Sequence, residues 1–166
     1  MLGVRKMLII AHSLKDIHFA QLMDVYVQSN SEGKTNILDA EQDFYTYLRD
    51  SFFREKGAFI AVWEIDGIYK AALRMEPYKN GLILAGLETA PEERRKGYAA
   101  LLINGVLQWL AERERVTVYS HVHKGNLASI AVHQFCGFNK ILDYAVYIDG
   151  SVLRDSITLS YEVYKK

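Results

Sequence analysis

Several features that narrow the class of a protein are scarce or absent in this sequence of 166 residues. It has one cysteine, Cys136, which excludes an intramolecular disulfide framework and a cysteine-rich zinc site. Twenty Lys and Arg balance 20 Asp and Glu, so the chain lacks the net positive charge typical of proteins that bind nucleic acid. No apolar run approaches the roughly 20 residues that cross a bilayer. We therefore expect a soluble, cytoplasmic protein with no nucleic-acid and no membrane partner.

The residues that are present suit one folded domain. Hydrophobic residues make up 50% of the chain and aromatic residues 12%, which supplies the apolar surface for a core that disordered chains lack. The length falls within the range of a single domain, and no repeat or low-complexity tract divides the chain. The apolar segment Met7–Ala11 is too short for the apolar region of a signal peptide. We expect a single domain over residues 1–166.

The apolar pattern changes repeatedly between the period of a strand and that of a helix. It predicts strands at 8–11, 58–65, 68–75, 82–87 and 116–122, helices after Ser13 and after Asp39, at 97–113 and at 127–136, and two final strands joined at Asp149-Gly150. Ser13 and Asp16 have capping-box spacing. The near-continuous apolar run Leu82–Leu87 is typical of a strand covered on both faces. The order of elements predicts an α+β fold with a mixed sheet.

Connections between these elements are marked by glycine and polar residues. Asp66-Gly67 and Asn80-Gly81 are tight-turn signals between strands. The polar stretch Ser29–Asn36 contains glycine and is predicted to be a mobile loop. A meander of antiparallel strands is therefore expected in front of a strand–helix–strand unit.

The segment Pro91–Ala99 has the features of an anion site. It lies between a buried strand and the start of an amphipathic helix, where backbone N–H groups lack partners and the helix dipole is positive. Gly97 allows close approach of a ligand, and Arg94, Arg95 and Lys96 add positive charge. The spacing matches neither a Walker A loop nor a Rossmann fingerprint. A charged helix start without a ligand explains the same residues.

A second segment, from Asn126 to Phe138, follows the next strand. The sequence Arg94-Arg95-Lys96-Gly97-Tyr98-Ala99 is similar to the R/Q-x-x-G-x-G/A loop of the GNAT family of acyl-CoA N-acyltransferases, and 126–138 is similar to the family's N-x-x-(A/S)-x-x-x-(Y)-x-x-x-G-F signature. The order of the elements also resembles that family over nearly the whole chain. The resemblance implies a GNAT fold: a central, mixed, mostly antiparallel twisted sheet of about seven strands with helices on both faces.

The resemblance also implies acetyl-CoA as the co-substrate, with no metal. Backbone N–H groups from Arg95 to Ala100 correspond to those that hold the pyrophosphate, and Leu87–Thr89 to the strand that pairs with the pantetheine arm. Asn126 and Ser129 match positions that contact this arm. A helix N-cap and a first-turn residue are equally good explanations of Asn126 and Ser129. The predicted coenzyme-binding residues are Leu87, Thr89, Arg94, Arg95, Lys96, Gly97, Tyr98, Ala99, Ala100, Asn126 and Ser129.

Three residues are predicted to carry the chemistry. The resemblance implies that the backbone N–H of Thr89 donates to the thioester carbonyl. His133 stands where the family commonly has a tyrosine that protonates the departing thiolate, and imidazole can donate a proton. A core-edge packing residue would fill the same position. Glu88 lies beside the expected thioester and is a candidate for the general base, directly or through a water.

Other reactive side chains have ordinary explanations. His121 and His123 share one face of a strand, but no motif adds the carboxylate that a zinc site with His133 would need. They are expected to face solvent or line a substrate pocket. Cys136 suggests an acyl-cysteine, although its position at a helix end favours the core. The tyrosines near the C-terminus are expected on a sheet face, and exposed aromatic strands there suggest a homodimer.

The resulting hypothesis is direct transfer of an acetyl group from acetyl-CoA to a primary amine of a small molecule or peptide. The alternatives are a non-catalytic acyl-CoA-binding or regulatory module of the same fold, and a nucleotide-binding domain that uses the basic loop. The acceptor is expected between the two N-terminal helices and the 29–36 loop. Their polar side chains favour a cationic small amine; they are Tyr26, Glu32, Asp39, Glu41, Asp43, Tyr45 and Tyr47.

Overall fold

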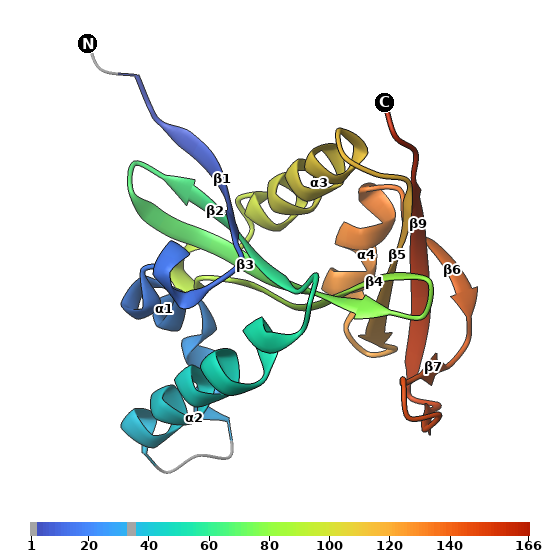
Figure 1. Ribbon diagram of the computed structural model, residues 1–166, viewed down its shortest axis with the longest axis horizontal. Helices are drawn as coiled ribbons and strands as arrows, with labels where there is room; N and C mark the ends of the chain where they lie inside the picture. Colours follow the sequence, from blue (N-terminus) through green and yellow to red (C-terminus); the bar gives the residue numbers. More distant parts are fainter. Residues whose placement is uncertain (1–2, 33–35) are drawn as a thin grey trace.

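A computed structural model gives the structure of the protein and describes residues 3–32 and 36–166 (Figure 1). The helices are α1 (Phe19–Ser31), α2 (Ile37–Asp50), α3 (Tyr98–Ala111) and α4 (Leu127–Phe135), with short 3-10 turns η1 (Leu14–Asp16), η2 (Phe52–Arg54) and η3 (Pro91–Glu93). The strands are β1 (Lys6–Ala11), β2 (Phe59–Ile65), β3 (Ile68–Tyr78), β4 (Gly81–Thr89), β5 (Val116–His123), β6 (Asn139–Leu142), β7 (Ala145–Val146), β8 (Val152–Leu153) and β9 (Ser156–Val163).

Seven of these strands form one sheet in the order β1-β2-β3-β4-β5-β9-β6. Every neighbouring pair is antiparallel except β4 and β5, which are parallel. The α3 crossover connects these two strands, as a parallel pair requires. Strands β7 and β8 form a separate two-stranded ribbon. The predicted α+β fold with a mixed, mostly antiparallel sheet of about seven strands is confirmed.

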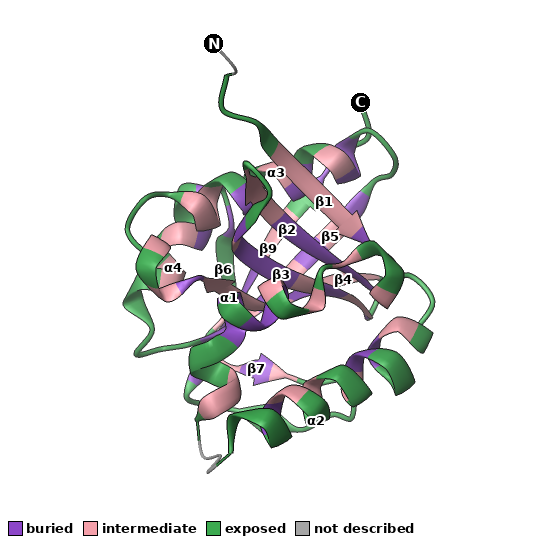
Figure 2. Ribbon diagram, turned by 90° about the vertical axis from the view of Figure 1, so that its left-hand side faces the viewer, coloured by how far each residue is buried: buried purple, intermediate pink, exposed green. Residues whose placement is uncertain are grey.

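Each face of the sheet has its own hydrophobic core, because successive strand side chains point to opposite faces. On β3, Leu73 and Met75 pack with the helices α3 and α4, whereas Ala72 packs with α1 and α2. Figure 1 shows the two helix pairs on opposite sides of the sheet, and Figure 2 shows that the central strands carry the buried residues. The predicted placement of helices on both faces is thereby confirmed.

The start of α1 differs from the prediction. Ser13–Asp16 does not cap this helix but closes η1, where the Asp16 carboxylate accepts from the backbone N–H of His12. The helix begins at Phe19, and its cap is the imidazole of His18, which accepts from the N–H of Gln21. The capping-box spacing was therefore a real local hydrogen-bond signal that belongs to a shorter turn.

The predicted mobile loop at 29–36 is also revised. Residues 29–31 are the last part of α1, Glu32 follows as a turn, and Asn36 caps α2 through its side chain. The remaining part of the prediction, 33–35, lies outside the described residues. The C-terminal prediction of two strands is wrong as well, because four strands follow α4 and the Asp149-Gly150 turn joins only the short β7 and β8.

Two predictions for β4 are corrected by its pairing. The turn before it consists of Lys79 and Asn80, so Gly81 is already in the strand. Within the apolar run Leu82–Leu87 only Leu84 is buried, and the other residues are half-buried. The parallel ladder to β5 covers three residue pairs, of which Leu84–Ser120 is the last. Beyond Leu84 the two strands separate, and the apolar run lines the opening instead of a core.

A β-bulge sits where the separation begins. Arg74 of β3 pairs with Ala85, and Ala72 pairs with Glu88, so two residues of β4 stand opposite one residue of β3. Gly86 takes the left-handed conformation at φ +59°, which is the usual role of glycine in such a bulge. The bulge bends β4 away from β5 and so positions the candidate site.

Candidate active site

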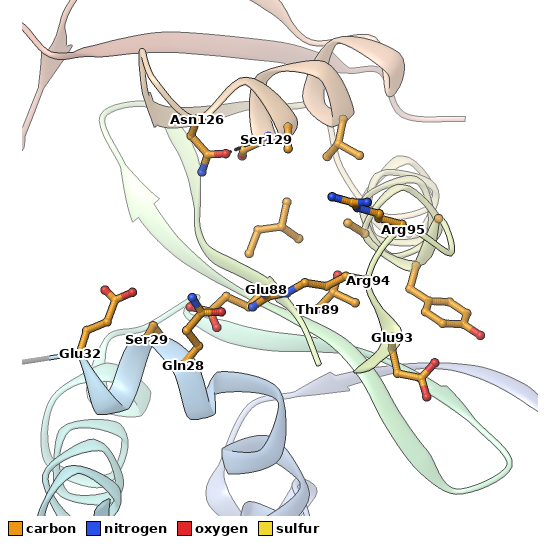
Figure 3. Close-up of a pocket in the computed structure, with 16 residues that line it drawn as sticks. Gln28, Ser29, Glu32, Glu88, Thr89, Glu93, Arg94, Arg95, Asn126 and Ser129 are labelled. Carbon is orange, nitrogen blue, oxygen red and sulfur yellow. Dashed lines mark hydrogen bonds between the residues drawn. The ribbon is translucent and has the colours of Figure 1, made fainter. Parts of the chain in front are cut away.

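A cavity of about 740 Å³ opens where β4 leaves β5. Figure 3 shows Glu88 and Thr89 of β4 between two walls, with Asn126 and Ser129 at the start of α4 on one side and residues of α1 on the other. The lining comes from five parts of the chain and consists of Gln28, Ser29, Glu32, Leu87, Glu88, Thr89, Glu93, Arg94, Arg95, Gly97, Tyr98, Ala99, Asn126, Ala128, Ser129 and Val132. Apart from His133, twelve residues were predicted to bind the coenzyme or to take part in catalysis. Ten of these twelve residues line this one cavity.

The N-terminus of α3 opens into this cavity. Gly97 is the N-cap in the left-handed conformation at φ +83°, and no side chain caps the helix. The first intrahelical bond to reach the cap runs from Leu101 to the Gly97 carbonyl, so the N–H groups of the preceding turn have no helical acceptor. No acidic residue occupies that turn. These free donors and the helix dipole favour an anion at this end of the cavity.

The three basic side chains of the loop do not lie together. Arg94 and Arg95 line the cavity and are exposed, and Arg95 itself adopts a left-handed backbone at φ +64°. Lys96 lies outside the lining, because its Nζ pairs with the Glu93 carboxylate at 2.9 Å. Lys70 contacts the other oxygen of Glu93 at 2.8 Å. Two arginines, and not the predicted three cations, therefore face the cavity.

The strand β4 presents an unpaired edge to the cavity. Its ladder to β5 ends at Leu84, so the backbone groups of 85–89 on that side have no strand partner. Leu87 and Thr89 line the cavity, as do Tyr98 and Ala99 at the start of α3. Ala100 is the one predicted backbone position of this helix turn that is not part of the lining. An extended polar ligand could add hydrogen bonds along this edge.

Glu88 is half-buried beside the open edge, and its Oε2 atom has no hydrogen-bond partner among the residues that the structure describes. Burial raises the pKa of this carboxyl group above its ordinary value, while Ser29, Arg94 and Arg74 act in the opposite direction. A carboxylate with an unused oxygen and a raised pKa is suited to accepting a proton.

Asn126 is the predicted N-cap of α4 and also lies on the cavity. Its side chain caps α4 by accepting from the N–H of Ser129 at 3.1 Å, and the residue also lines the cavity. Ser129, Ala128 and Val132 lie on the same wall. The last two were missed in the sequence, although their spacing from Ser129 places them near it on one helix face.

His133 does not line the cavity. It is 1% exposed, and its Nδ1 lies 2.7 Å from the carbonyl oxygen of Ser129. Because a carbonyl only accepts, Nδ1 carries the proton, and Nε2 accepts from the Ser120 hydroxyl at 2.9 Å. Burial lowers the pKa of His133, which keeps the ring neutral. Both ring nitrogens are occupied inside the core.

The other candidate residues also have defined places. Cys136 ends α4 and is buried, with a pKa raised by burial, so its thiol is not activated. His123 is exposed and accepts from the N–H of Gly125. Within the described residues no cluster of three potential metal ligands occurs. His121 lies on a second cavity.

This second cavity, of about 550 Å³, was not predicted. Its lining is Glu76, Tyr78, Ile83, Leu84, Ala85, Gly86, His121, Tyr147, Ile148 and Asp149. Gly86 lines this cavity and Leu87 lines the first, so the two cavities adjoin at the bulge. An isolated glycine within an apolar strand is a signal for a bulge or a close approach, and the sequence contained it.

Comparisons with known proteins identify the class of protein that this fold and cavity define. The sequence matches the model of the Acetyltransferase (GNAT) family over residues 19–138. The chain belongs to the GNAT family of acetyltransferases. Among curated proteins no match was found.

Solved structures of similar fold belong to N-acetyltransferases. The ribosomal-protein-S18-alanine N-acetyltransferase of Escherichia coli is 17% identical, with a TM-score of 0.65 and 96% of each chain covered. The spermidine N-acetyltransferase of Vibrio cholerae in complex with CoA and spermine is 16% identical, with a TM-score of 0.62 and coverage of 96% of this chain and 95% of that one. The PaiA N-acetyltransferase of Thermoplasma acidophilum in complex with coenzyme A is 13% identical, with a TM-score of 0.66 and coverage of 97% and 99%. These structures share the fold.

No helix within residues 3–32 and 36–166 is long and apolar enough to span a membrane.

Proposed function

We propose that the protein transfers the acetyl group of acetyl-CoA to a primary amine by direct attack, with residues 1–166 acting as one domain. The observation that carries this proposal is the cavity in which an unpaired strand edge, β4, leads to an uncapped helix N-terminus, α3. An extended amide chain fits the first feature, and a pyrophosphate fits the second. Acetyl-CoA contains both groups in that order. Two solved structures of the same fold are complexes with coenzyme A.

The coenzyme is held by backbone donors and two arginines in this proposal. The N–H groups of Tyr98, Ala99 and Ala100 bind the pyrophosphate, and Arg94 and Arg95 add charge at the same end of the cavity. Gly97 keeps this approach open, since no atom lies within 4 Å of the position that a Cβ would take. Leu87 and Thr89 pair with the pantetheine arm, and Asn126 and Ser129 form the opposite wall. Lys96 contributes long-range charge only.

The reaction removes two protons from the substrate nitrogen and replaces the C–S bond of the thioester by a C–N bond. The substrate ammonium gives a proton to Glu88, directly or through a water, and its nitrogen attacks the thioester carbonyl carbon. The backbone N–H of Thr89 donates to the oxyanion, which is the usual way that a fixed donor stabilises this charge. The nitrogen then loses its second proton to solvent, the C–S bond breaks, and CoA leaves as the thiolate as the amide forms. The raised pKa and the unused oxygen of Glu88 support this assignment.

His133 has a different role in this proposal from the one expected from the sequence. A buried ring with a lowered pKa is a scarce source of protons near pH 7. Its two hydrogen bonds instead join α4 to β5 and hold Ser129 at the cavity wall. We assign His133 to positioning, and solvent protonates the thiolate.

The experiment is a continuous assay of free thiol with acetyl-CoA and a panel of primary amines. The proposal expects amine-dependent release of CoA together with an equal amount of acetylated amine by mass spectrometry. The alternative, a binding module without catalysis, expects acetyl-CoA binding by calorimetry but no amine-dependent release. A nucleotide-binding domain expects ATP to bind as tightly as acetyl-CoA, which the same calorimetry measures.

A further inference from the structure

The second cavity and the Glu88 side chain lie on the same face of the sheet. Leu84 packs in the core with α3, so its neighbours Ile83 and Ala85 point to the opposite face, where they line the second cavity. Glu88 pairs in register with Ala72, which packs with α1 and α2. Residues that pair directly across two strands share a face, so Glu88 also points to this side. A molecule in the second cavity can therefore present a group to Glu88 without crossing the sheet.

The two cavities meet along β4. Gly86 lines the second cavity and Glu88 lines the first, and only Leu87 separates the two residues in the chain. A strand advances about 3.3 Å per residue, so Gly86 and Glu88 are about 7 Å apart along β4. A group that occupies the second cavity thus needs only a short carbon linker to place an amine at Glu88.

Three aromatic rings form the wall of the second cavity opposite β4. Tyr78 and Tyr147 both pack edge-to-face with His121, with ring centroids 5.4 Å and 5.3 Å from it. The Tyr78 hydroxyl donates to the carbonyl of Val146, which fixes the residue before Tyr147 to β3. Aromatic pairs in this geometry stabilise a contact beyond the area they bury. The wall therefore offers fixed ring edges and faces to a further aromatic ring.

Two large apolar side chains on this cavity are exposed. Tyr147 is 41% exposed and Ile148 is 74% exposed, and both line the cavity together with Ile83 and Ala85 of β4. Exposed apolar side chains that gather beside a concave surface are typical of a binding site, and small-molecule sites are lined mainly by apolar and aromatic residues. A bulky apolar group in the cavity would cover them.

The two carboxylates on the lining, Glu76 and Asp149, already accept hydrogen bonds within the protein. Glu76 accepts from the Tyr47 hydroxyl at 3.0 Å. Asp149 accepts from the backbone N–H and the hydroxyl of Ser151 at 2.9 Å and 2.6 Å. Their negative charge disfavours a second carboxylate in the cavity.

A second ammonium is disfavoured as well, because a cation already lies beside the aromatic wall. Lys79 Nζ is 5.4 Å from the centre of the Tyr78 ring. Burial and the charge of Lys79 lower the pKa of His121, which keeps this ring neutral. The second cavity therefore suits an uncharged apolar group better than an ion of either sign.

We propose that the acceptor is a primary amine that carries an aromatic ring, with the ring in the second cavity and the amine at Glu88. This inference rests on the proposed acetyl transfer and specifies its second substrate. The ring packs between the apolar residues of β4 and the edge-to-face cluster of Tyr78, His121 and Tyr147. A polyamine would instead place its second ammonium in an apolar cavity beside Lys79.

The test compares amines that share the reacting group and differ in what they place in the second cavity. Phenethylamine, cyclohexylethylamine, ethylamine and putrescine are each assayed for CoA release with the whole chain. We expect phenethylamine to exceed ethylamine and putrescine in kcat/KM by about 30-fold or more, the scale for burying an aromatic ring. It should exceed cyclohexylethylamine by about threefold or more, since only the aromatic ring can make edge-to-face contacts.

Variants of Tyr147 locate the ring. In Tyr147→Ala the ratio of phenethylamine to ethylamine in kcat/KM should fall to about a third of the parent ratio or less, because one wall of the cavity is lost. Tyr147→Phe keeps the ring and should keep the ratio. The control Tyr164→Ala removes an exposed tyrosine outside the lining of both cavities and should also leave the ratio unchanged. A ratio of two substrates cancels any general loss of active protein.

The outcomes separate this inference from the function on which it rests. Turnover of ethylamine or putrescine at least as fast as phenethylamine overturns the aromatic acceptor and leaves acetyl transfer intact. Equal turnover of cyclohexylethylamine and phenethylamine overturns recognition of the ring by aromatic contacts. A Tyr147→Ala variant that keeps the parent ratio overturns the placement of the ring in the second cavity. Absence of CoA release with every amine overturns the transfer itself.

Discussion

The imidazole of His133 and the hydroxyl of Ser120 are joined by a buried hydrogen bond of 2.9 Å between α4 and β5. The other ring nitrogen donates to the Ser129 carbonyl one helical turn earlier. The neutral ring thus accepts from the Ser120 hydroxyl and donates to the Ser129 carbonyl, and it packs edge-to-face with Phe138. A residue with these contacts holds the α4 wall of the cavity in place. Protonation of His133 should therefore change the free energy of unfolding more than the rate of the reaction.

The first prediction concerns stability and pH. Burial lowers the pKa of His133 in the folded state, so below its ordinary value near 6.5 the unfolded chain binds more protons than the folded one. The contribution of the neutral His133 ring to the free energy of unfolding is complete above about pH 6.5 and is lost as pH falls below that value. His133→Asn keeps an N–H donor but does not titrate, so its free energy of unfolding should fall less between pH 7 and 5.5. Urea unfolding at both pH values measures the difference.

The effect of one group is bounded by about 1.4 kcal/mol per pH unit. His121 shifts in the same direction, and the comparison of variant with parent removes its contribution. Identical pH dependence in the two proteins would show that His133 has the same pKa in the folded and the unfolded state. An alkaline fall in kcat that disappears in His133→Asn would restore the role of general acid.

The second prediction concerns the base. Glu88 acts as a carboxylate, and burial raises its pKa, so kcat/KM should increase with pH through that raised pKa before the amine itself titrates. Glu88→Gln should lower kcat by roughly 10²-fold or more and remove this acid limb. Stopped assays between pH 5 and 8 measure both effects. Glu92→Gln, an exposed neighbour on η3, is the matched control, and equal losses in the two variants would contradict the assignment.

The third prediction concerns the coenzyme loop. Gly97→Val fills the open space above the start of α3 and should weaken acetyl-CoA binding by about tenfold or more, since the phosphate N–H contacts need close approach. Calorimetry measures the dissociation constant. Gly150→Val places the same side chain at a similar φ of +87°, also in open space, but in the β7–β8 turn. Equal affinities of the two variants would argue against a pyrophosphate at Gly97.

The fourth prediction concerns Cys136. Its thiol is buried at the end of α4, 3.7 Å from the Ala100 carbonyl, and its pKa is raised. Cys136→Ala should keep turnover and lose about 1 kcal/mol of stability through the small cavity that remains. Intact-mass spectrometry of the parent during turnover should find no acetyl group on the chain. An acetylated Cys136 formed and consumed at the turnover rate would replace direct attack by an acyl-enzyme route.

Much of the fold could be predicted from local signals. The Asp66-Gly67 turn, the α3 stripe around Val106 and the Gly137 end of α4 are each determined by residues close in sequence, and the structure has them in place. The Ser13–Asp16 spacing did not predict the start of α1, because these residues form a separate short turn in which Asp16 accepts from the N–H of His12. Apolar content alone could not show that Leu82–Leu87 lines an opening, since a cavity wall and a core strand have the same composition.

The parts of the candidate site whose backbone geometry follows from a local motif could be predicted from the sequence. The parts that depend on contacts between distant side chains could not. Gly97 and Asn126 are the N-caps of α3 and α4, and both line the cavity. Lys96 is not part of the cavity lining; its Nζ pairs with Glu93, which is fixed by a second contact to Lys70 on β3. The second cavity includes the bulge at Gly86, a tertiary feature that depends on the pairing of β3 with β4.

Amine-dependent release of CoA thiol, followed with the mass of the acetylated product, tests the central claim most directly. The account predicts one acetylated amine for each thiol released and a rate that falls by roughly 10²-fold in Glu88→Gln while acetyl-CoA still binds. Tight binding of acetyl-CoA without any amine-dependent release of thiol would contradict it.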